Sequence, residues 1–204
     1  MHYISLMTLT QQDRLALRIT DAYRLHQAVY AAHEDLRSKQ DKQDGKSSGF
    51  LWVDKGIKDG LQRVLMLSNR LPSAHIQQEF GHITSKPLPD GFLTHAQYRF
   101  ETVVAPMKRV RNRARAIHDE AKIVQWFLDN ASQKWGFEVA PHAVSLEQTQ
   151  QIYINGKHKT FVKQAKLSGV LTVTDPAVFA NSFYNGIGRQ KTFGCGLLQI
   201  TPIL

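Results

Sequence analysis

Residues 167–203, LSGVLTVTDPAVFANSFYNGIGRQKTFGCGLLQITPI, indicate most clearly what fold the chain adopts. The segment begins with alternating apolar residues, which predict a strand. Asp175 and Pro176 are residue types that favour the N-cap and first turn of a helix, which we expect to continue to about Tyr184. A glycine-rich stretch then leads into a last strand, expected at Leu197–Ile203. This order of elements is typical of an α+β fold.

Two successive βαββαβ patterns occupy the chain. In the first half we expect a strand at Tyr3–Leu9, a helix at about Asp21–His33, a loop at Ser38–Ser48, strands at Phe50–Val53 and Arg63–Leu67, a short helix around Ser73–Gln78 and a strand containing Ile83. In the second half we expect a strand near Ala96–Ala105, a helix over Ala116–Gln133, strands near Phe137–Val144, Ile152–Ile154, Lys159–Val162 and Leu167–Thr174, and then the helix and strand described above. The cluster KPLPDG at Lys86–Gly91 marks a linker. The chain is therefore predicted to form two tandem ferredoxin-like halves with antiparallel sheets, residues 1–88 and 92–204.

The charge balance favours a polyanionic partner. The chain has 26 Lys and Arg against 17 Asp and Glu, a formal net charge of +9. Such an excess favours nucleic acid first, although a basic surface also serves solubility or an anionic membrane. The single cysteine, Cys195, excludes an internal disulfide and a zinc site of several cysteines. The first residues lack the pattern of a signal peptide and no stretch reaches membrane-spanning length, so we expect a cytoplasmic protein.

The helix expected at Asp21–His33 carries a candidate catalytic residue. Along it, Tyr23, His26, Tyr30 and His33 form a stripe beside the apolar face, because separations of three, four and seven residues return to nearly the same angle. An imidazole titrates near neutral pH and can exchange the protons that RNA cleavage moves, from the ribose 2′-hydroxyl and to the departing 5′-oxygen. The alternative is a histidine that only packs at the helix edge.

Two basic segments are candidates for contact with phosphates. The first, KRVRNRAR, contains no acid and contributes Lys108, Arg109, Arg111, Arg113 and Arg115. Guanidinium groups suit bidentate contact with phosphate, but a solvated charge run in a loop is the alternative. The second, IYINGKHKTF at 152–161, has a hairpin turn at Asn155-Gly156. Its candidate RNA-binding residues are Tyr153, Lys157, His158 and Lys159, and Lys163, just after the segment, is a further candidate. The competing interpretation is an ordinary edge hairpin whose lysines discourage aggregation.

A third candidate is the glycine-rich segment GIGRQKTFGCGLL at 186–198. Its glycines, Gly186, Gly188, Gly194 and Gly196, would let the backbone approach a phosphate closely, while Arg189 and Lys191 add positive charge. The segment is neither a Walker loop nor a Rossmann fingerprint, because no Gly-Lys-Ser/Thr step is present and a strand follows it. A structural glycine turn is the alternative.

Together these residues resemble the CasE family, the type I-E members of the CRISPR repeat-processing endoribonucleases. GIGRQKTFGCGLLQITP resembles the family's terminal glycine-rich loop and last strand, and LSGVLTVTDPAVF its penultimate strand and helix start. At the other end, DAYRLHQAVY is similar to a Tyr-x-Leu-His-Gln-like segment of the family. Between them, GFLWVD, RVLMLS and YRFETVVAPMKR fit the family's strands in order.

This resemblance implies a metal-independent endoribonuclease that cuts the hairpin of CRISPR repeat RNA at its 3′ base. It implies that His26 is the general acid or base and that Tyr23 orients or polarises the 2′-hydroxyl. The products would be a 2′,3′-cyclic phosphate, or its opened 3′-phosphate, and a 5′-hydroxyl. The implied partners are the crRNA and the subunits of Cascade, in which the product is retained, and the free protein is expected to be a monomer.

No cofactor and no metal are expected from the sequence. His118, Asp119 and Glu120 are adjacent and would point in different directions on a helix, so they do not form a metal site. Two other functions stay open on the residues alone. One is a non-catalytic RNA-binding RRM-like module, and the other is a nucleotide-binding ferredoxin-like protein that holds a small phosphate in its glycine loop.

Overall fold

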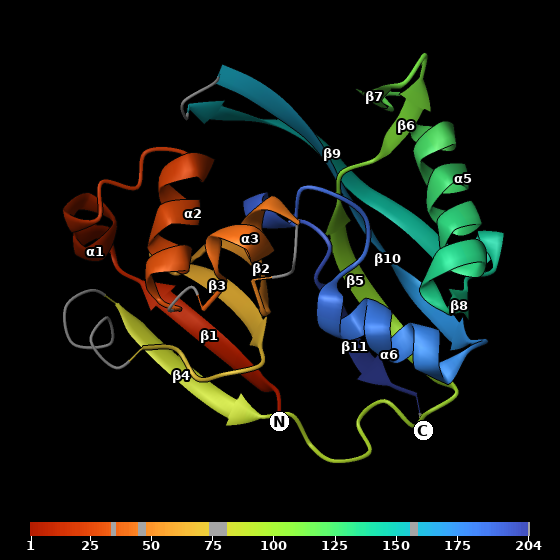
Figure 1. Cartoon of the computed structure of the whole chain (residues 1–204), viewed down its shortest axis with the longest axis horizontal. Helices are drawn as coiled ribbons and strands as arrows, with labels where there is room; N and C mark the ends of the chain where they lie inside the picture. The colour runs from red at the N-terminus through yellow and green to blue at the C-terminus, as the bar shows by residue number, and fades with distance from the viewer. Residues whose placement is uncertain (34–35, 45–47, 74–80, 156–158, 204) are drawn as a thin grey trace.

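The computed structural model describes residues 1–33, 36–44, 48–73, 81–155 and 159–203. Its described residues contain two large antiparallel sheets side by side (Figure 1) and a separate two-stranded sheet. The first sheet has the strand order β2-β3-β1-β4. Its strands are β1 (Tyr3–Leu9), β2 (Phe50–Lys58), β3 (Leu61–Ser68) and β4 (His82–Pro87), and the helices between β1 and β2 are α1 (Gln11–Ala16), α2 (Ala22–Ala31) and α3 (Lys39–Gln43). The expected short helix at Ser73–Gln78 lies mostly outside the described residues.

The second sheet has the order β11-β5-β10-β8, with β9 paired to β10. Its strands are β5 (Gln97–Val104), β8 (Phe137–Glu138), β9 (Val144–Asn155), β10 (Lys159–Val173) and β11 (Leu198–Pro202). The helical elements of this half are α5 (Glu120–Asn130), the π-helical turn η1 (Ala131–Trp135), the 3-10 turns η2 (Pro141–Ala143) and η3 (Lys191–Phe193), and α6 (Pro176–Asn185). In the first half β1 lies between β3 and β4, and in the second half β5 lies between β10 and β11. In both halves the first strand is therefore central and pairs with the last, as in a ferredoxin-like unit. The predicted tandem ferredoxin-like fold is confirmed.

Strand β2 joins the two halves because it is buried on both faces. Phe50 and Trp52 point to the side covered by α2, where Leu25 and Val29 are buried against them. Leu51 packs on the other side, within the core of the second half. Alternate side chains of a strand point to opposite faces, so one short apolar run supplies two cores.

The core of the second half is largely aromatic. Tyr98 and Phe100 point from β5 toward α5 and α6, where Phe100 stacks on Phe127 at 5.5 Å between ring centroids. Phe179 of α6 lies 5.4 Å from Tyr98. Asp175 caps α6 by accepting hydrogen bonds from two backbone amides of its first turn, as the sequence predicts.

The prediction of a loop at Ser38–Ser48 was wrong in part, because Lys39–Gln43 forms the helix α3. Ser38 and Asp41 bond reciprocally to each other's backbone amides, which is a capping box. A capping box also starts α1, which the sequence reading missed, with Thr10 and Asp13 as partners. Short polar segments can therefore begin a helix without an apolar face.

The bounds of several strands in the second half also differ from prediction. The strands expected at Ile152–Ile154 and Lys159–Val162 belong to one long hairpin, β9–β10, which continues through the segment expected at Leu167–Thr174. The strand expected at Phe137–Val144 is only two residues long, since Pro141 begins the turn η2. The helix expected at Ala116–Gln133 begins later, where Asp119 caps α5.

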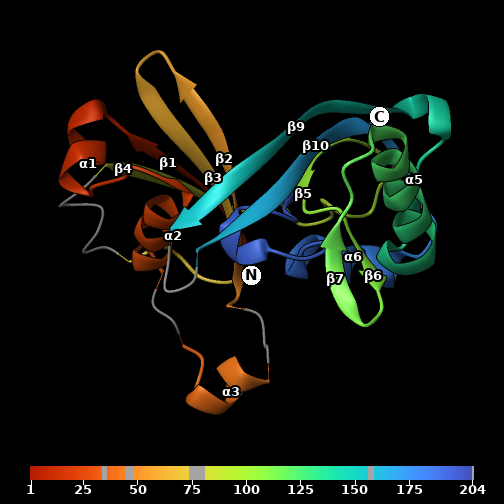
Figure 2. The ribbon, with the colours of Figure 1, turned by 90° about the horizontal axis from the view of Figure 1, so that it is seen from above.

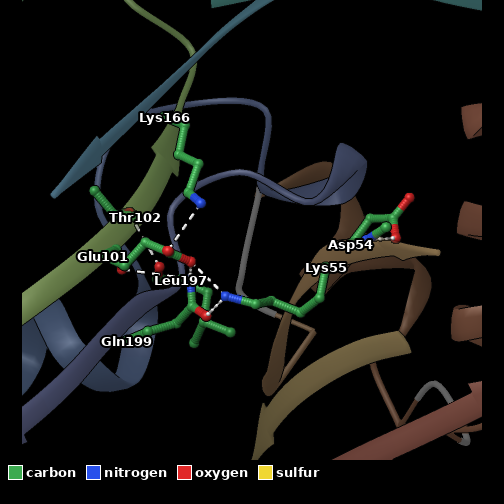
Figure 3. A network of polar contacts seen from close by, with 8 residues as sticks. Asp54, Lys55, Glu101, Thr102, Lys166, Leu197 and Gln199 are labelled. Carbon is green, nitrogen blue, oxygen red and sulfur yellow. Dashed lines mark hydrogen bonds and ion pairs between the residues drawn. The ribbon is translucent and has the colours of Figure 1, made fainter. Parts of the chain in front are cut away.

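A polar cluster also holds the halves together, and Figure 3 shows it at the junction. Lys55 of β2 and Lys166 of β10 both contact the carboxylate of Glu101 on β5, and Lys166 does so at 2.9 Å. Lys55 also donates a hydrogen bond to Gln199 Oε1 at 2.8 Å. Burial alone would raise the pKa of Glu101, but the hydrogen bonds and charges of the two lysines outweigh burial and lower it. The carboxylate therefore stays ionised and bridges the halves.

His33 makes the stability of the first half depend on pH. Its side chain is 2% exposed and stacks on Phe50 with 4.6 Å between ring centroids. Burial, assisted by the charge of Arg70, lowers the pKa of His33 from 6.5 to about 4. A pKa below that of the unfolded chain means that the neutral ring stabilises the fold above about pH 6.5, and this stabilisation is lost as the pH falls toward 4.

We expect the free energy of unfolding to fall by about 2 kcal/mol between about pH 7.5 and about pH 5 through His33 alone. The variant His33→Phe keeps a ring against Phe50 but cannot titrate, so it should lack this component. Urea unfolding of both proteins at the two pH values measures the difference. An equal pH dependence in the two proteins would contradict the assignment.

Candidate functional site

His26 lies at the contact between α2 and the glycine-rich loop. Asp21 caps α2 by accepting a hydrogen bond from the Arg24 amide at 2.9 Å, which fixes the start of the helix. From the second turn, the His26 ring lies 4.1 Å from the ring of Tyr30 and 5.5 Å from that of Phe193, which belongs to η3. The first and last quarters of the chain thus meet at this imidazole.

The surroundings of His26 favour its neutral form. Burial lowers its pKa below 6.5, and a hydrogen bond with the backbone of Thr192 opposes this effect only in part. The Nδ1 atom is buried and has no hydrogen-bond partner among the residues that the structure describes. Histidine in its neutral form is the species that can accept a proton near neutral pH.

Trp52 positions the loop that contacts His26. Its indole Nε1 donates a hydrogen bond to the carbonyl of Thr192 at 3.2 Å. Gly194 follows with a φ of +76°, and a Cβ at that position would lie 3.1 Å from the Trp52 ring. The loop backbone can approach the indole this closely because residue 194 has no side chain.

The glycines of this loop mainly allow close packing. The amide of Gly196 donates to the carbonyl of Val103 at 2.7 Å, and that of Gly194 donates to Lys191 at 3.2 Å. Both glycines are buried. The expectation that their amides face a phosphate is therefore corrected: these two donors are already paired within the protein.

Other residues of the loop are accessible. Arg189 is exposed, and Gly186 and Gly188 are partly exposed with positive φ. Lys191 is half-buried, and its Nζ donates to the carbonyl of Asn185 at the end of α6, at 2.7 Å. Burial lowers the pKa of Lys191. The charge of Arg189 is available to an external partner, whereas that of Lys191 is directed to a helix end.

The basic segment KRVRNRAR, for which the sequence predicts no strand, lies in a hairpin formed by β6 (Met107–Val110) and β7 (Arg113–Ala116). Arg111 and Asn112 form its turn with φ of 45° and 61°, the geometry of a tight hairpin turn. All five candidate cations are exposed, and none forms an ion pair among the described residues: Lys108, Arg109, Arg111, Arg113 and Arg115. In both views this hairpin stands beside α5, apart from α2 (Figures 1 and 2).

The long β9–β10 hairpin extends from the second sheet to α2, as Figure 2 shows. Ile154 and Val162 on its inner face are buried in a cluster that also contains Tyr23 and Phe193. The hairpin, α2 and the glycine-rich loop therefore meet around Tyr23, whose ring lies 6.0 Å from that of His26.

The outer face of this hairpin carries further candidate residues. Lys159 is exposed, Lys163 is partly exposed and Tyr153 is 38% exposed. The candidate residues Lys157 and His158 lie outside the described part of the chain. The sequence reading missed Trp52, Thr192 and Phe193 at the site, because a contact between residues 140 apart leaves no signal in local periodicity.

Comparison with known proteins identifies the family. The family model described as CRISPR associated protein matches residues 2–202. The chain belongs to this family. No curated protein sequence matches the chain significantly.

Solved structures share the fold of this CRISPR associated protein. The CRISPR endoribonuclease Cse3 bound to a 19-nucleotide RNA has a TM-score of 0.82 at 20% identity, over 98% of this chain and 99% of the other. Thermus thermophilus Cse3, bound to an RNA representing a pre-cleavage complex, has a TM-score of 0.79 at 19% identity, with 98% and 99% covered. Cas6e of Escherichia coli K-12 has a TM-score of 0.64 at 18% identity, with each chain covered completely.

In the described part of this CRISPR associated protein, no three His, Cys, Asp or Glu side chains are grouped as metal ligands would be. No described helix combines the length and apolar character that a membrane span requires. Cys195 is buried, and burial raises the pKa of its thiol to about 12. The thiol therefore stays protonated at neutral pH and is not a nucleophile.

The ring of Phe193 should keep the pKa of His26 low, because it covers the imidazole. We expect Phe193→Ala to raise the pKa of His26 toward 6.5 as water reaches the ring. NMR titration of the imidazole proton resonances measures the shift. Phe161→Ala, on the outer face of the β9–β10 hairpin, is the matched control, and an unchanged pKa in Phe193→Ala would show that this ring does not shield His26.

Proposed function

We propose that this protein is a metal-independent endoribonuclease that binds the hairpin of CRISPR repeat RNA and processes precursor crRNA. The observation that carries the proposal is a neutral, half-buried His26 at the junction of α2, a glycine-rich loop and a basic hairpin. Relatives of the same fold are named CRISPR endoribonuclease and have been solved with RNA, which supports the same activity here. The first half, residues 1–88, contributes the catalytic helix, and the second, residues 92–204, the basic hairpins and the loop.

His26 acts as the base that takes the proton from the ribose 2′-hydroxyl, and Tyr23 orients that hydroxyl. The 2′-oxygen attacks the phosphorus as the bond to the 5′-oxygen breaks, and the departing oxygen takes a proton from water. The products are a 2′,3′-cyclic phosphate, which can open to a 3′-phosphate, and a 5′-hydroxyl. The lowered pKa of His26 supports the role of base, because most rings are unprotonated at neutral pH.

Lysine and arginine side chains hold the RNA. Those of the β6–β7 hairpin project into solvent without ion pairs among the described residues, so an RNA phosphate can displace their counterions without breaking a protein contact. The deep, narrow major groove of A-form RNA exposes few base edges, so recognition rests on phosphates, shape and unpaired bases.

The protein retains its product and joins Cascade. A relative of the same fold, at 18% identity and a TM-score of 0.68, is part of a CRISPR RNA-guided surveillance complex, which supports this assignment. Slow release of the crRNA and few turnovers per enzyme follow.

We expect wild-type protein to cleave a repeat-hairpin RNA in EDTA and His26→Ala to lose at least about 100-fold in rate, the usual contribution of a general base. His26→Ala should still bind the RNA. A 2′-deoxy substitution at the cut position should block cleavage by wild type, because the attacking oxygen is absent. Cleavage that survives His26→Ala, or binding by wild type without cleavage, would instead indicate a non-catalytic RNA-binding module.

The β6–β7 hairpin should contribute to the salt dependence of binding. Lys108, Arg113 and Arg115 share one face of this hairpin by their pairing register. We expect the triple substitution to Gln to lower the slope of log K against log salt by about 2, since each phosphate contact contributes about 0.7 to 0.9. Arg109→Gln, on the opposite face, is the control and should change the slope by less than 1. Filter binding at several salt concentrations measures the slope, and an unchanged slope in the triple variant would remove this hairpin from the RNA interface.

A further inference from the structure

Two aromatic rings lie side by side on the outer face of the β9–β10 hairpin. Tyr153 and Phe161 are directly paired across the strands, with 5.1 Å between ring centroids. Tyr153 is 38% exposed and Phe161 is 65% exposed. The pair forms an apolar surface that no described element covers.

Packing of the hairpin does not explain these rings. Ile152 and Val162, the neighbouring cross-strand pair, point to the inner face, where Val162 is buried beside Tyr23. The inner face therefore anchors the hairpin, and the outer rings add little to this anchor. Large exposed apolar side chains that lie together on a surface commonly mark a binding site.

The residues around the pair define the chemistry of its partner. Lys159 and Lys163 lie on the same face, two positions before and after Phe161 on β10. The sequence from 148 to 166 contains no Asp or Glu. Flat apolar rings beside cations complement a nucleotide, whose base offers a π-face and whose phosphate is negative.

We propose that Tyr153 and Phe161 form a stacking platform for an unpaired nucleotide that flanks the stem of the bound RNA. This inference rests on the proposed function and names an element of the RNA that the site recognises. A base inside the stem has both faces covered by its neighbours, so only an unpaired base can lay a free face on the rings. Lys159 and Lys163 contact the phosphates on either side of that nucleotide.

The platform fixes the position of the RNA along the cleavage site. The inner face of the same hairpin packs against Tyr23, so a base held on the outer face ties the bound RNA to an element that borders the residues around His26. The platform contributes to the affinity for RNA and to the position of the RNA on the protein, and it takes no part in breaking the bond. Loss of the platform should weaken the complex with RNA, and it should leave the rate of RNA cleavage at saturating enzyme nearly unchanged.

The test compares two RNAs: a repeat hairpin with its unpaired flanks, and the same hairpin trimmed to a blunt stem. Phe161→Ala and the double variant with Tyr153→Ala remove the platform, whereas Phe161→Trp keeps a ring. Leu15→Ala, which removes a 70% exposed apolar side chain on α1, is the matched control. 2-Aminopurine placed at each flanking position reports stacking by quenching of its fluorescence.

We expect Phe161→Ala to weaken binding of the flanked RNA about ten-fold, with no change for the blunt stem. Quenching at one flanking position should disappear in Phe161→Ala and persist in Phe161→Trp. Equal losses on both RNAs, or no loss on either, would overturn the platform. Failure of wild type to bind the hairpin RNA would instead overturn the proposed function, whereas binding and cleavage by wild type with no effect of Phe161→Ala would overturn the platform alone.

Discussion

The hydrogen bond from the Trp52 indole to the carbonyl of Thr192 joins the parts of the chain on which the site depends. Trp52 is 2% exposed and lies in the core beneath α2, the helix that carries His26. Its partner lies in the glycine-rich loop, and the backbone of the same residue bonds to the His26 ring. A shift of the loop would therefore change both the covering of the imidazole and its hydrogen bonding. The glycines are needed here for close approach, first to the indole and then between the two arms of the loop.

Two histidines on one helix face are buried to different degrees, and burial changes their pKa values accordingly. His26 and His33 are seven residues apart, so they lie on nearly the same side of α2 and its end. His33 is buried and stacks on Phe50, and burial lowers its pKa to about 4, too low to exchange protons near neutral pH. The loop covers His26 only in part, and its pKa is lowered less. Helical periodicity alone cannot make this distinction, because the covering residues come from other parts of the chain.

The sequence predicts the fold better than it predicts the site. Alternating apolar runs and helix caps such as Asp175 depend on neighbours in the chain, so the two ferredoxin-like halves could be inferred from them. The sequence predicts no strand over the residues of the β6–β7 hairpin, because this segment is mostly charged and its turn uses Arg111 and Asn112 rather than glycine. The covering of His26 by Phe193 is a tertiary contact with no local signal. The glycine-rich loop was recognised as special, but two of its glycines prove to serve packing.

The distribution of charge supports a polyanionic partner more strongly than the net charge does. Lys55 and Lys166 are held by Glu101 at the junction of the halves, so these cations stabilise the fold. The cations of the β6–β7 hairpin have no such partner among the described residues, and their mutual repulsion on a narrow hairpin is unfavourable in the free protein. An RNA backbone, which carries regularly spaced negative charges, relieves that repulsion and releases counterions when it binds. The positive charges of the β6–β7 hairpin therefore favour binding of a polyanion and do not stabilise the fold. The carboxylate of Glu101, which joins the halves, is paired with two other lysines.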